Sequence, residues 1–76
     1  MSLKPIQADR LIKILANVGF VPLRQRGGHV ILRNKDGRLI VVPVHRGEKI
    51  GRGLLLRIIK ESGLTRERFL ELLNSI

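Results

Sequence analysis

The chain has 76 residues, a formal net charge of +9, and no cysteine, tryptophan or tyrosine. Its length accommodates one hydrophobic core, so we expect a single domain over residues 1–76. The lack of cysteine excludes a disulfide-stapled secreted miniprotein and a cysteine-ligated zinc site. The longest apolar run, residues 39–44, is far shorter than the roughly 20 residues that cross a bilayer. We therefore expect a cytoplasmic domain with no signal peptide and no membrane partner.

Positive charge is concentrated in the middle of the chain. Residues 24–57 carry nine basic and two acidic side chains, whereas residues 58–76 carry three of each. A basic surface of this strength is typical of proteins that bind nucleic acid, although a merely soluble surface or a face for an acidic protein has the same composition. The two aromatic residues, Phe20 and Phe69, lie among apolar neighbours. We therefore expect RNA contacts through Arg, Lys and backbone N–H groups rather than base stacking on aromatic rings.

The first third of the chain predicts a helix followed by a strand. Apolar residues recur with helical spacing over residues 6–18, and Gly19 suits the left-handed conformation that ends many helices. Residues 20–24 predict a short strand, which Pro22 places at the edge of a sheet. The glycine pair at 27–28 then interrupts the strand.

A β-hairpin is predicted next. Residues 29–33 and 38–44 are rich in β-branched side chains and flank the turn-forming sequence Asn-Lys-Asp-Gly at 34–37. Pro43 indicates that the end of the last strand has no ladder partner on one side.

The rest of the chain predicts a loop and two helices. Three glycines favour a loop over residues 46–53, and a helix over residues 54–62 should end at Gly63. Thr65 can cap a last helix over residues 66–73. The order α-β-β-β-α-α predicts an α+β domain, in which helices cover one face of a three-stranded antiparallel sheet.

The two histidines are the strongest catalytic candidates. The acids are scattered and the serines lie far from either histidine in sequence, so neither a carboxylate metal cluster nor a serine triad is predicted. A two-residue turn pairs His29 with Val44, whereas a loop one residue longer pairs it with His45; the sequence leaves both registers open. In either register both imidazoles lie at the end of the hairpin away from the turn, with Cα atoms roughly 5–8 Å apart.

Two neighbouring imidazoles suit RNA cleavage without a metal. One accepts the proton of the 2′-hydroxyl and the other protonates the leaving 5′-oxygen, near neutral pH because the unperturbed pKa of histidine is about 6.5. Arg24 and Arg26 would hold the scissile phosphate, which the N–H groups of Gly27 and Gly28 can approach closely. A histidine at a strand end and a glycine pair in a turn are also ordinary features of non-catalytic domains. No nucleotide-binding motif and no cofactor is indicated.

Several short motifs follow one another at specific spacings. They are Gly-Phe at 19–20, Arg-Gln-Arg-Gly-Gly-His at 24–29, Asp-Gly-Arg at 36–38, Val-Pro-Val-His at 42–45 and a leucine-rich segment at 53–64. Their combination, over residues 10–73, resembles the HicA (YcfA-like) toxins, the mRNA-interferase toxins of HicA–HicB toxin–antitoxin pairs.

The resemblance implies a double-stranded-RNA-binding-domain-like fold, ribosome-independent cleavage of mRNA, and a HicB-like antitoxin that covers the active site. His29 matches the catalytic histidine of the family, and Gly28 stands where many members have serine. His45, which the hairpin places near His29, is a secondary catalytic candidate. A non-catalytic double-stranded-RNA-binding module, an inactive toxin and a protein-interaction domain are the alternatives. We expect RNA contacts from a set of glycines and basic residues: Arg24, Arg26, Gly27, Gly28, Arg46, Arg52 and Arg57.

Overall fold

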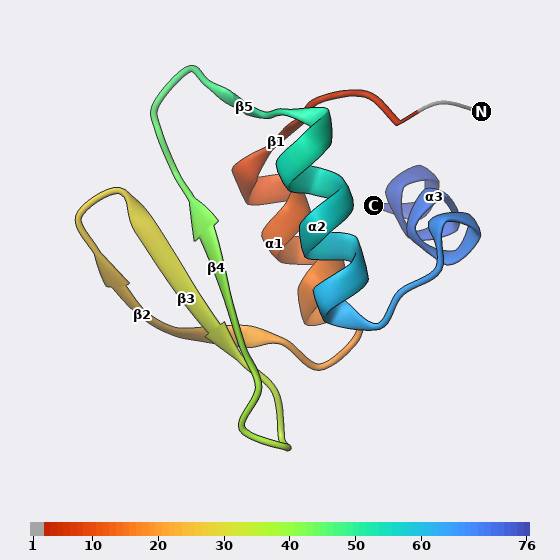
Figure 1. Cartoon of the computed structure of the whole chain (residues 1–76). Coiled ribbons are helices and arrows are strands. Elements are labelled where there is room, and N and C mark those ends of the chain that lie inside the picture. Colours follow the sequence, from red (N-terminus) through yellow and green to blue (C-terminus); the bar gives the residue numbers. More distant parts are fainter. Residues whose placement is uncertain (1–2) are drawn as a thin grey trace.

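The computed structural model of the protein describes residues 3–76, which form two small antiparallel sheets and three helices (Figure 1). The elements in chain order are β1 (Ile6–Gln7), α1 (Ala8–Ala16), β2 (Val21–Arg26), β3 (His29–Arg33), β4 (Leu39–Pro43), β5 (Lys49–Ile50), α2 (Arg52–Ser62) and α3 (Arg66–Ser75). The main sheet has the strand order β2-β3-β4, and β1 pairs with β5. The predicted α+β class, with one helix before the three-stranded sheet and two after it, is confirmed.

The short β1–β5 ladder is the element that sequence periodicity did not predict. Ile6 lies opposite Ile50 in this ladder, and both side chains are buried. The expected helix over residues 6–18 therefore begins later, at Ala8. The expected loop over residues 46–53 is wrong in its second half, because β5 and the first turn of α2 occupy it. Two-residue strands carry too little pattern to be recognised from sequence.

Two capping residues set the end of α2 and the start of α3, as the sequence predicted. Gly63 has a φ of 82°, so it ends α2 in the left-handed conformation that glycine adopts without strain. Thr65 caps α3, because its hydroxyl accepts a hydrogen bond of 3.1 Å from the backbone N–H of Arg68. Within residues 3–76, no helix is long and apolar enough to cross a membrane.

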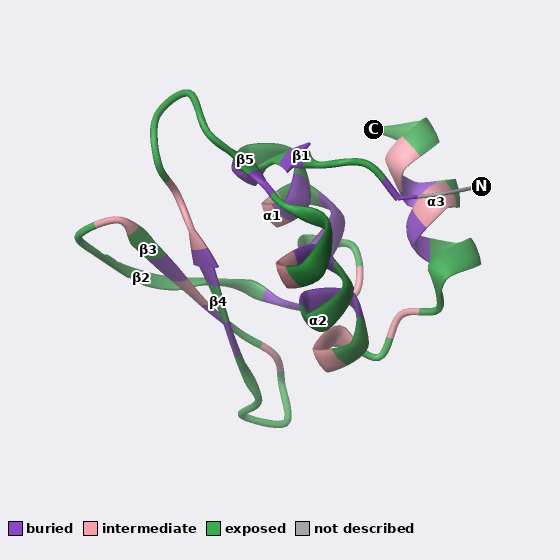
Figure 2. Ribbon diagram, turned by 45° about the horizontal axis from the view of Figure 1, so that its top comes forward, coloured by how far each residue is buried: buried purple, intermediate pink, exposed green. Residues whose placement is uncertain are grey.

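The hydrophobic core lies between the main sheet and the helices. Side chains alternate along β3 and β4, so that one face is buried and the other is open, while β2 is exposed along its whole length (Figure 2). Each fully buried Leu, Ile or Phe contributes about 1.5–3 kcal/mol relative to an exposed one. The most deeply buried side chains are Leu11, Ile14, Leu15, Phe20, Leu32, Ile40, Val42, Leu55, Ile58 and Phe69.

The helices form a second and a third layer on the buried face of the sheet. Figure 1 shows α1 and α2 beside the sheet, with α3 on the side of these helices away from it. The guanidinium of Arg10 on α1 donates a hydrogen bond of 3.0 Å to the carbonyl of Leu73 on α3. Within residues 3–76 no helix covers the open face of the sheet, and α2 lies beside this face at the β4 edge.

The register of the hairpin differs from both registers considered from the sequence. His29 lies opposite Pro43, rather than opposite Val44 or His45, and Arg33 lies opposite Leu39. Residues opposite one another share a face, so His29 and Pro43 both lie on the open face. The two expected registers are therefore wrong, while the placement of both histidines away from the hairpin turn is confirmed.

Asn34 sets this register. Its side-chain oxygen accepts hydrogen bonds from the backbone N–H groups of Asp36 and Arg38, at 3.1 and 2.8 Å. The backbone N–H of Asn34 donates a hydrogen bond of 3.1 Å to the backbone carbonyl of Arg38, and Gly37 adopts a φ of 82°. The turn therefore spans residues 34–38 instead of the two residues that Asp-Gly alone favours.

Candidate functional site

His29 is placed by the tight turn that joins β2 to β3. Gly27, with a φ of 56°, and Gly28 form this turn, and the chain enters β3 at His29. Arg26 and Pro43 are the register partners of His29 on its two sides. The imidazole is exposed on the open face of the sheet, between a basic strand and the edge strand β4.

His45 reaches the same end of the sheet just after β4. The N–H of Val44 donates a hydrogen bond of 2.6 Å to the carbonyl of Gly28, which ties this segment to the β2–β3 turn. The His45 ring lies against Gly28, since a Cβ added there would be 2.9 Å from Cε1 of His45. The ring centroids of His29 and His45 are 6.3 Å apart, with an edge-on angle of 78° between the rings. Two exposed imidazoles from different elements therefore share one site.

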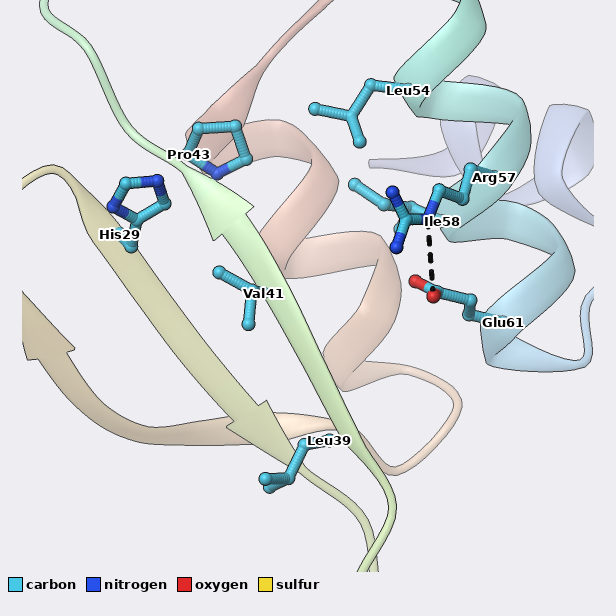
Figure 3. A pocket seen from close by; sticks show the side chains of 8 residues that line it. All are labelled: His29, Leu39, Val41, Pro43, Leu54, Arg57, Ile58 and Glu61. Carbon is cyan, nitrogen blue, oxygen red and sulfur yellow. Dashed lines mark ion pairs between the residues drawn. The ribbon is translucent and has the colours of Figure 1, made fainter.

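A groove of about 300 Å³ extends from His29 to helix α2. Figure 3 shows His29 on the sheet side of this groove, with Arg57 and Glu61 pointing from α2 toward it. Apolar side chains line the space between them: Leu39, Val41, Pro43, Leu54 and Ile58. A hollow of about 80 Å³ shares Pro43 and Leu54 with this groove and is also lined by His45 and Lys49.

The α2 wall of the groove carries an ion pair. Nε of Arg57 lies 3.5 Å from Oε2 of Glu61, one helical turn further on. The guanidinium of Arg38 donates a hydrogen bond of 2.7 Å to the backbone carbonyl of Glu61, so the hairpin turn also contacts this end of α2. The Arg57 side chain is 74 % exposed and that of Glu61 is 43 % exposed. Because water screens such a pair, it contributes little to stability.

The other sequence-predicted RNA contacts are spread over β2, the loop after β4 and the start of α2. Arg24 and Arg26 are exposed on β2, and Arg24 lies opposite Ile31. Arg46 lines an open hollow together with His45. Arg52 is the first residue of α2 and is exposed. The structure thus brings Arg26, Gly27, Gly28 and His45 to the His29 end of the sheet, and it places Arg57 across the groove.

Most of this positive charge is available to a ligand. Among residues 3–76, Arg57–Glu61 and Arg68–Glu71 are the two ion pairs within 4.0 Å. The arginines beside the histidines lie outside both pairs. A cluster of exposed guanidinium groups of this kind attracts phosphates, with an affinity that falls as salt is added.

Six residues that line the groove were not predicted from the sequence as site residues: Leu39, Val41, Pro43, Leu54, Ile58 and Glu61. Glu61 follows Arg57 by four residues, a spacing that places both side chains on the same face of a helix. That spacing is a usable signal for the ion pair. The neighbouring sheet positions follow only from the register, which the sequence left open.

The fold and the site define a small basic α+β domain of the double-stranded-RNA-binding-domain-like class, with two histidines beside a groove. A family model described as "HicA toxin of bacterial toxin-antitoxin" matches residues 8–64, which include every residue of this groove. The chain belongs to the HicA toxin family of bacterial toxin–antitoxin systems. A toxin of this kind implies a cognate antitoxin. No curated protein matches the chain.

Proposed function

We propose that this toxin is a metal-independent endoribonuclease that cleaves mRNA, with His29 as general base or general acid and His45 as the second proton carrier. The observation that carries the proposal is the pair of exposed imidazoles, with ring centroids 6.3 Å apart, with Arg26 opposite His29 in the sheet and Arg46 next to His45 in the chain. Membership of the HicA family supports the same assignment.

The chemistry needs only proton transfer and charge stabilisation. One imidazole, in its neutral form, accepts the proton of the 2′-hydroxyl, and the 2′-oxygen attacks the adjacent phosphorus. The other imidazole, in its protonated form, gives a proton to the 5′-oxygen as the P–O5′ bond breaks. The products are a 2′,3′-cyclic phosphate and a free 5′-hydroxyl. A phosphate between the rings is within reach of both, because each hydrogen bond spans about 2.6–3.2 Å.

Basic side chains and backbone N–H groups would hold the scissile phosphate and the strand on either side of it. Arg26 flanks His29 in the sheet, and the Gly27–Gly28 turn presents its backbone beside both histidines. Charged donors fixed around a phosphate stabilise the extra negative charge of the transition state. The wider RNA contacts would come from Arg24, Arg46, Arg52 and Arg57.

The direct test incubates purified protein with a long mRNA in EDTA. Wild type should cleave, and His29→Ala should lower the rate by about 10² or more, because one proton transfer is lost. His45→Ala should also slow cleavage. Truncating an exposed imidazole leaves no cavity, so both variants should keep the wild-type circular dichroism spectrum and RNA affinity. Undiminished cleavage by folded His29→Ala would overturn the assignment.

A second candidate function is a non-catalytic double-stranded-RNA-binding module, which the double-stranded-RNA-binding-domain-like fold favours. Such a domain contacts phosphates and 2′-hydroxyls across a duplex, so its binding weakens steeply with salt. If neither wild type nor His29→Ala cleaves RNA while salt-sensitive duplex binding persists, this function replaces the nuclease.

The partner of the toxin would be a HicB-like antitoxin that covers this side of the sheet. Three apolar residues of strands β2 and β4 are about half exposed: Val21, Leu39 and Val41. Exposed apolar side chains beside arginines are complementary to an antitoxin surface that has apolar residues at its centre and acidic residues at its rim. Titrating a HicB-like antitoxin into the cleavage reaction should inhibit it, and Val41→Asp should weaken that inhibition. Equal inhibition of this variant would place the antitoxin elsewhere.

A further inference from the structure

We infer that the groove between His29 and α2 binds one unstacked nucleobase of the RNA, and that Glu61 and Arg57 give this site a preference for guanine. The inference rests on the proposed function for its substrate, RNA, and adds a base-recognition site next to the reacting phosphate. Its starting point is a groove that has a histidine at one wall, an ion pair at the other and apolar side chains between them.

The size and the lining of the groove suit the flat face of a base. Its volume of about 300 Å³ lies at the lower end of the range for small-molecule sites. Val41, Pro43 and Leu54 present apolar surface without an aromatic ring, and Ile58 closes the floor, being 1 % exposed. A base that leaves the stack can bury its apolar faces against such side chains while its polar edge points toward Arg57 and Glu61 on α2.

A carboxylate in the groove favours a base over a phosphate as the occupant. Glu61 is the one acidic side chain among the residues that line it. An ionised carboxylate only accepts hydrogen bonds, so it repels a phosphate and attracts N–H groups. The strand's phosphates would therefore follow the arginines outside the groove, and a base would enter it.

The ion pair leaves hydrogen-bonding groups for a base. The contact joins Nε of Arg57 to Oε2 of Glu61 and uses one lone pair of that oxygen, so the other lone pair of Oε2, Oε1 and the two Nη groups of Arg57 stay available to a ligand. The bond from Arg38 to the backbone of Glu61 fixes this end of α2 next to the sheet. The groove thus presents an acceptor and a set of donors side by side.

Guanine is the base whose edge matches this arrangement most fully. Its N1–H and N2–H₂ groups are adjacent donors that a carboxylate accepts together, and its O6 is an acceptor for the guanidinium. Adenine and cytosine offer one amino group beside a ring nitrogen that is itself an acceptor. The lone pair of this nitrogen repels the carboxylate oxygen. Uracil offers one N–H between two carbonyl oxygens. A paired set of hydrogen bonds therefore distinguishes guanine from the other three bases.

The test measures base binding without cleavage. Guanosine, inosine and adenosine 3′-monophosphates are titrated into the protein while amide NMR signals of the groove are followed. Inosine differs from guanosine only by lacking the N2 amino group. Wild type should bind the guanosine nucleotide about tenfold more tightly than the other two, with the largest shifts around Val41 and Leu54.

Two variants form a matched pair for this titration. Glu61→Gln keeps the shape of the side chain but loses the paired acceptors, so it should bind all three nucleotides with similar affinity. Glu71→Gln removes the carboxylate of a similar exposed pair, 3.4 Å from Arg68 on α3, which lies outside the groove. This control should keep the tenfold preference for guanosine.

Each outcome decides the inference separately from the nuclease activity. A guanosine preference that Glu61→Gln removes and Glu71→Gln keeps supports the base site, even if no RNA is cleaved in EDTA. Equal affinity of wild type for the three nucleotides, a preference that survives Glu61→Gln, or shifts confined to residues outside the groove would overturn the base site. In those cases, cleavage that depends on His29 would still stand.

Discussion

The imidazole ring of His45 lies directly against Gly28. A Cβ on Gly28 would come within 2.9 Å of Cε1 and 3.3 Å of Nδ1 of that ring, closer than such atoms pack. Gly28 does not have a positive φ, in contrast to Gly27, so its backbone would accept another residue. The glycine is therefore needed for the position of the second histidine rather than for the turn itself.

This contact predicts that Gly28→Ala lowers the rate of RNA cleavage without unfolding the protein. The added methyl group displaces the exposed His45 ring, which can rotate away, and a displaced proton carrier costs about tenfold or more in rate. RNA affinity should change little, because the arginines are untouched. Single-turnover cleavage at saturating protein, together with a binding isotherm, separates the two effects.

A double-mutant cycle gives this prediction its control. If Gly28→Ala acts by moving His45, it should have no further effect in a His45→Ala background. Gly53→Ala serves as the matched single variant, because a Cβ there meets nothing within 4 Å. Additive losses in the cycle, or an equal loss in Gly53→Ala, would show that the effect does not pass through His45.

The pair of histidines predicts a bell-shaped dependence of the cleavage rate on pH. One imidazole must be neutral and the other protonated, so the rate should fall in acid, where the base is protonated, and again in alkali, where the acid is deprotonated. His45→Ala should remove one limb of the bell and leave the other. The rate of His45→Ala is measured across the same pH range at constant ionic strength. An unchanged two-limbed profile would exclude His45 as the second proton carrier.

The elements of the fold were predictable from sequence because strong local signals mark them. The turn sequence at 34–37 forms the expected hairpin, although with a longer loop, and Gly63 and Thr65 end and begin helices as expected. Each of these signals acts within a few residues. The position of His29 next to a glycine turn was predictable for the same reason, since the glycine pair and His29 are neighbours in the chain.

The detailed geometry of the site was not predictable, because it depends on the register of β3 and β4. Strand β4 reads Leu-Ile-Val-Val-Pro and is apolar at every position, so its pattern marks neither face as the buried one. A loop of two residues and a loop of five fit this strand equally well. The residues that line the groove and the contact between Gly28 and His45 depend on the loop length, so the sequence did not predict them either.

The position of Arg26 predicts a specific change in the salt dependence of RNA binding. Arg26 is the register neighbour of His29 on β2, and its side chain is exposed. If it contacts a phosphate, Arg26→Gln should lower the slope of log affinity against log salt by about 1. Arg66→Gln, on the exposed first turn of α3, should leave the slope unchanged. Equal slopes for wild type and Arg26→Gln would remove Arg26 from the RNA contact surface.

The hydrogen bonds of Asn34 predict that this residue stabilises the fold and the site together. Asn34→Ala removes the acceptor of the Asp36 and Arg38 N–H groups, which should lower the free energy of unfolding by about 1 kcal/mol. Urea denaturation measures this change, and Lys35→Ala, an exposed neighbour in the same turn, should stay within about 0.5 kcal/mol of wild type. Because the turn fixes which residue lies opposite His29, Asn34→Ala should also broaden the NMR signals of His29 and Pro43. Wild-type stability and sharp signals in Asn34→Ala would mean that the packing of Leu32 and Ile40 in the core holds the register without the turn.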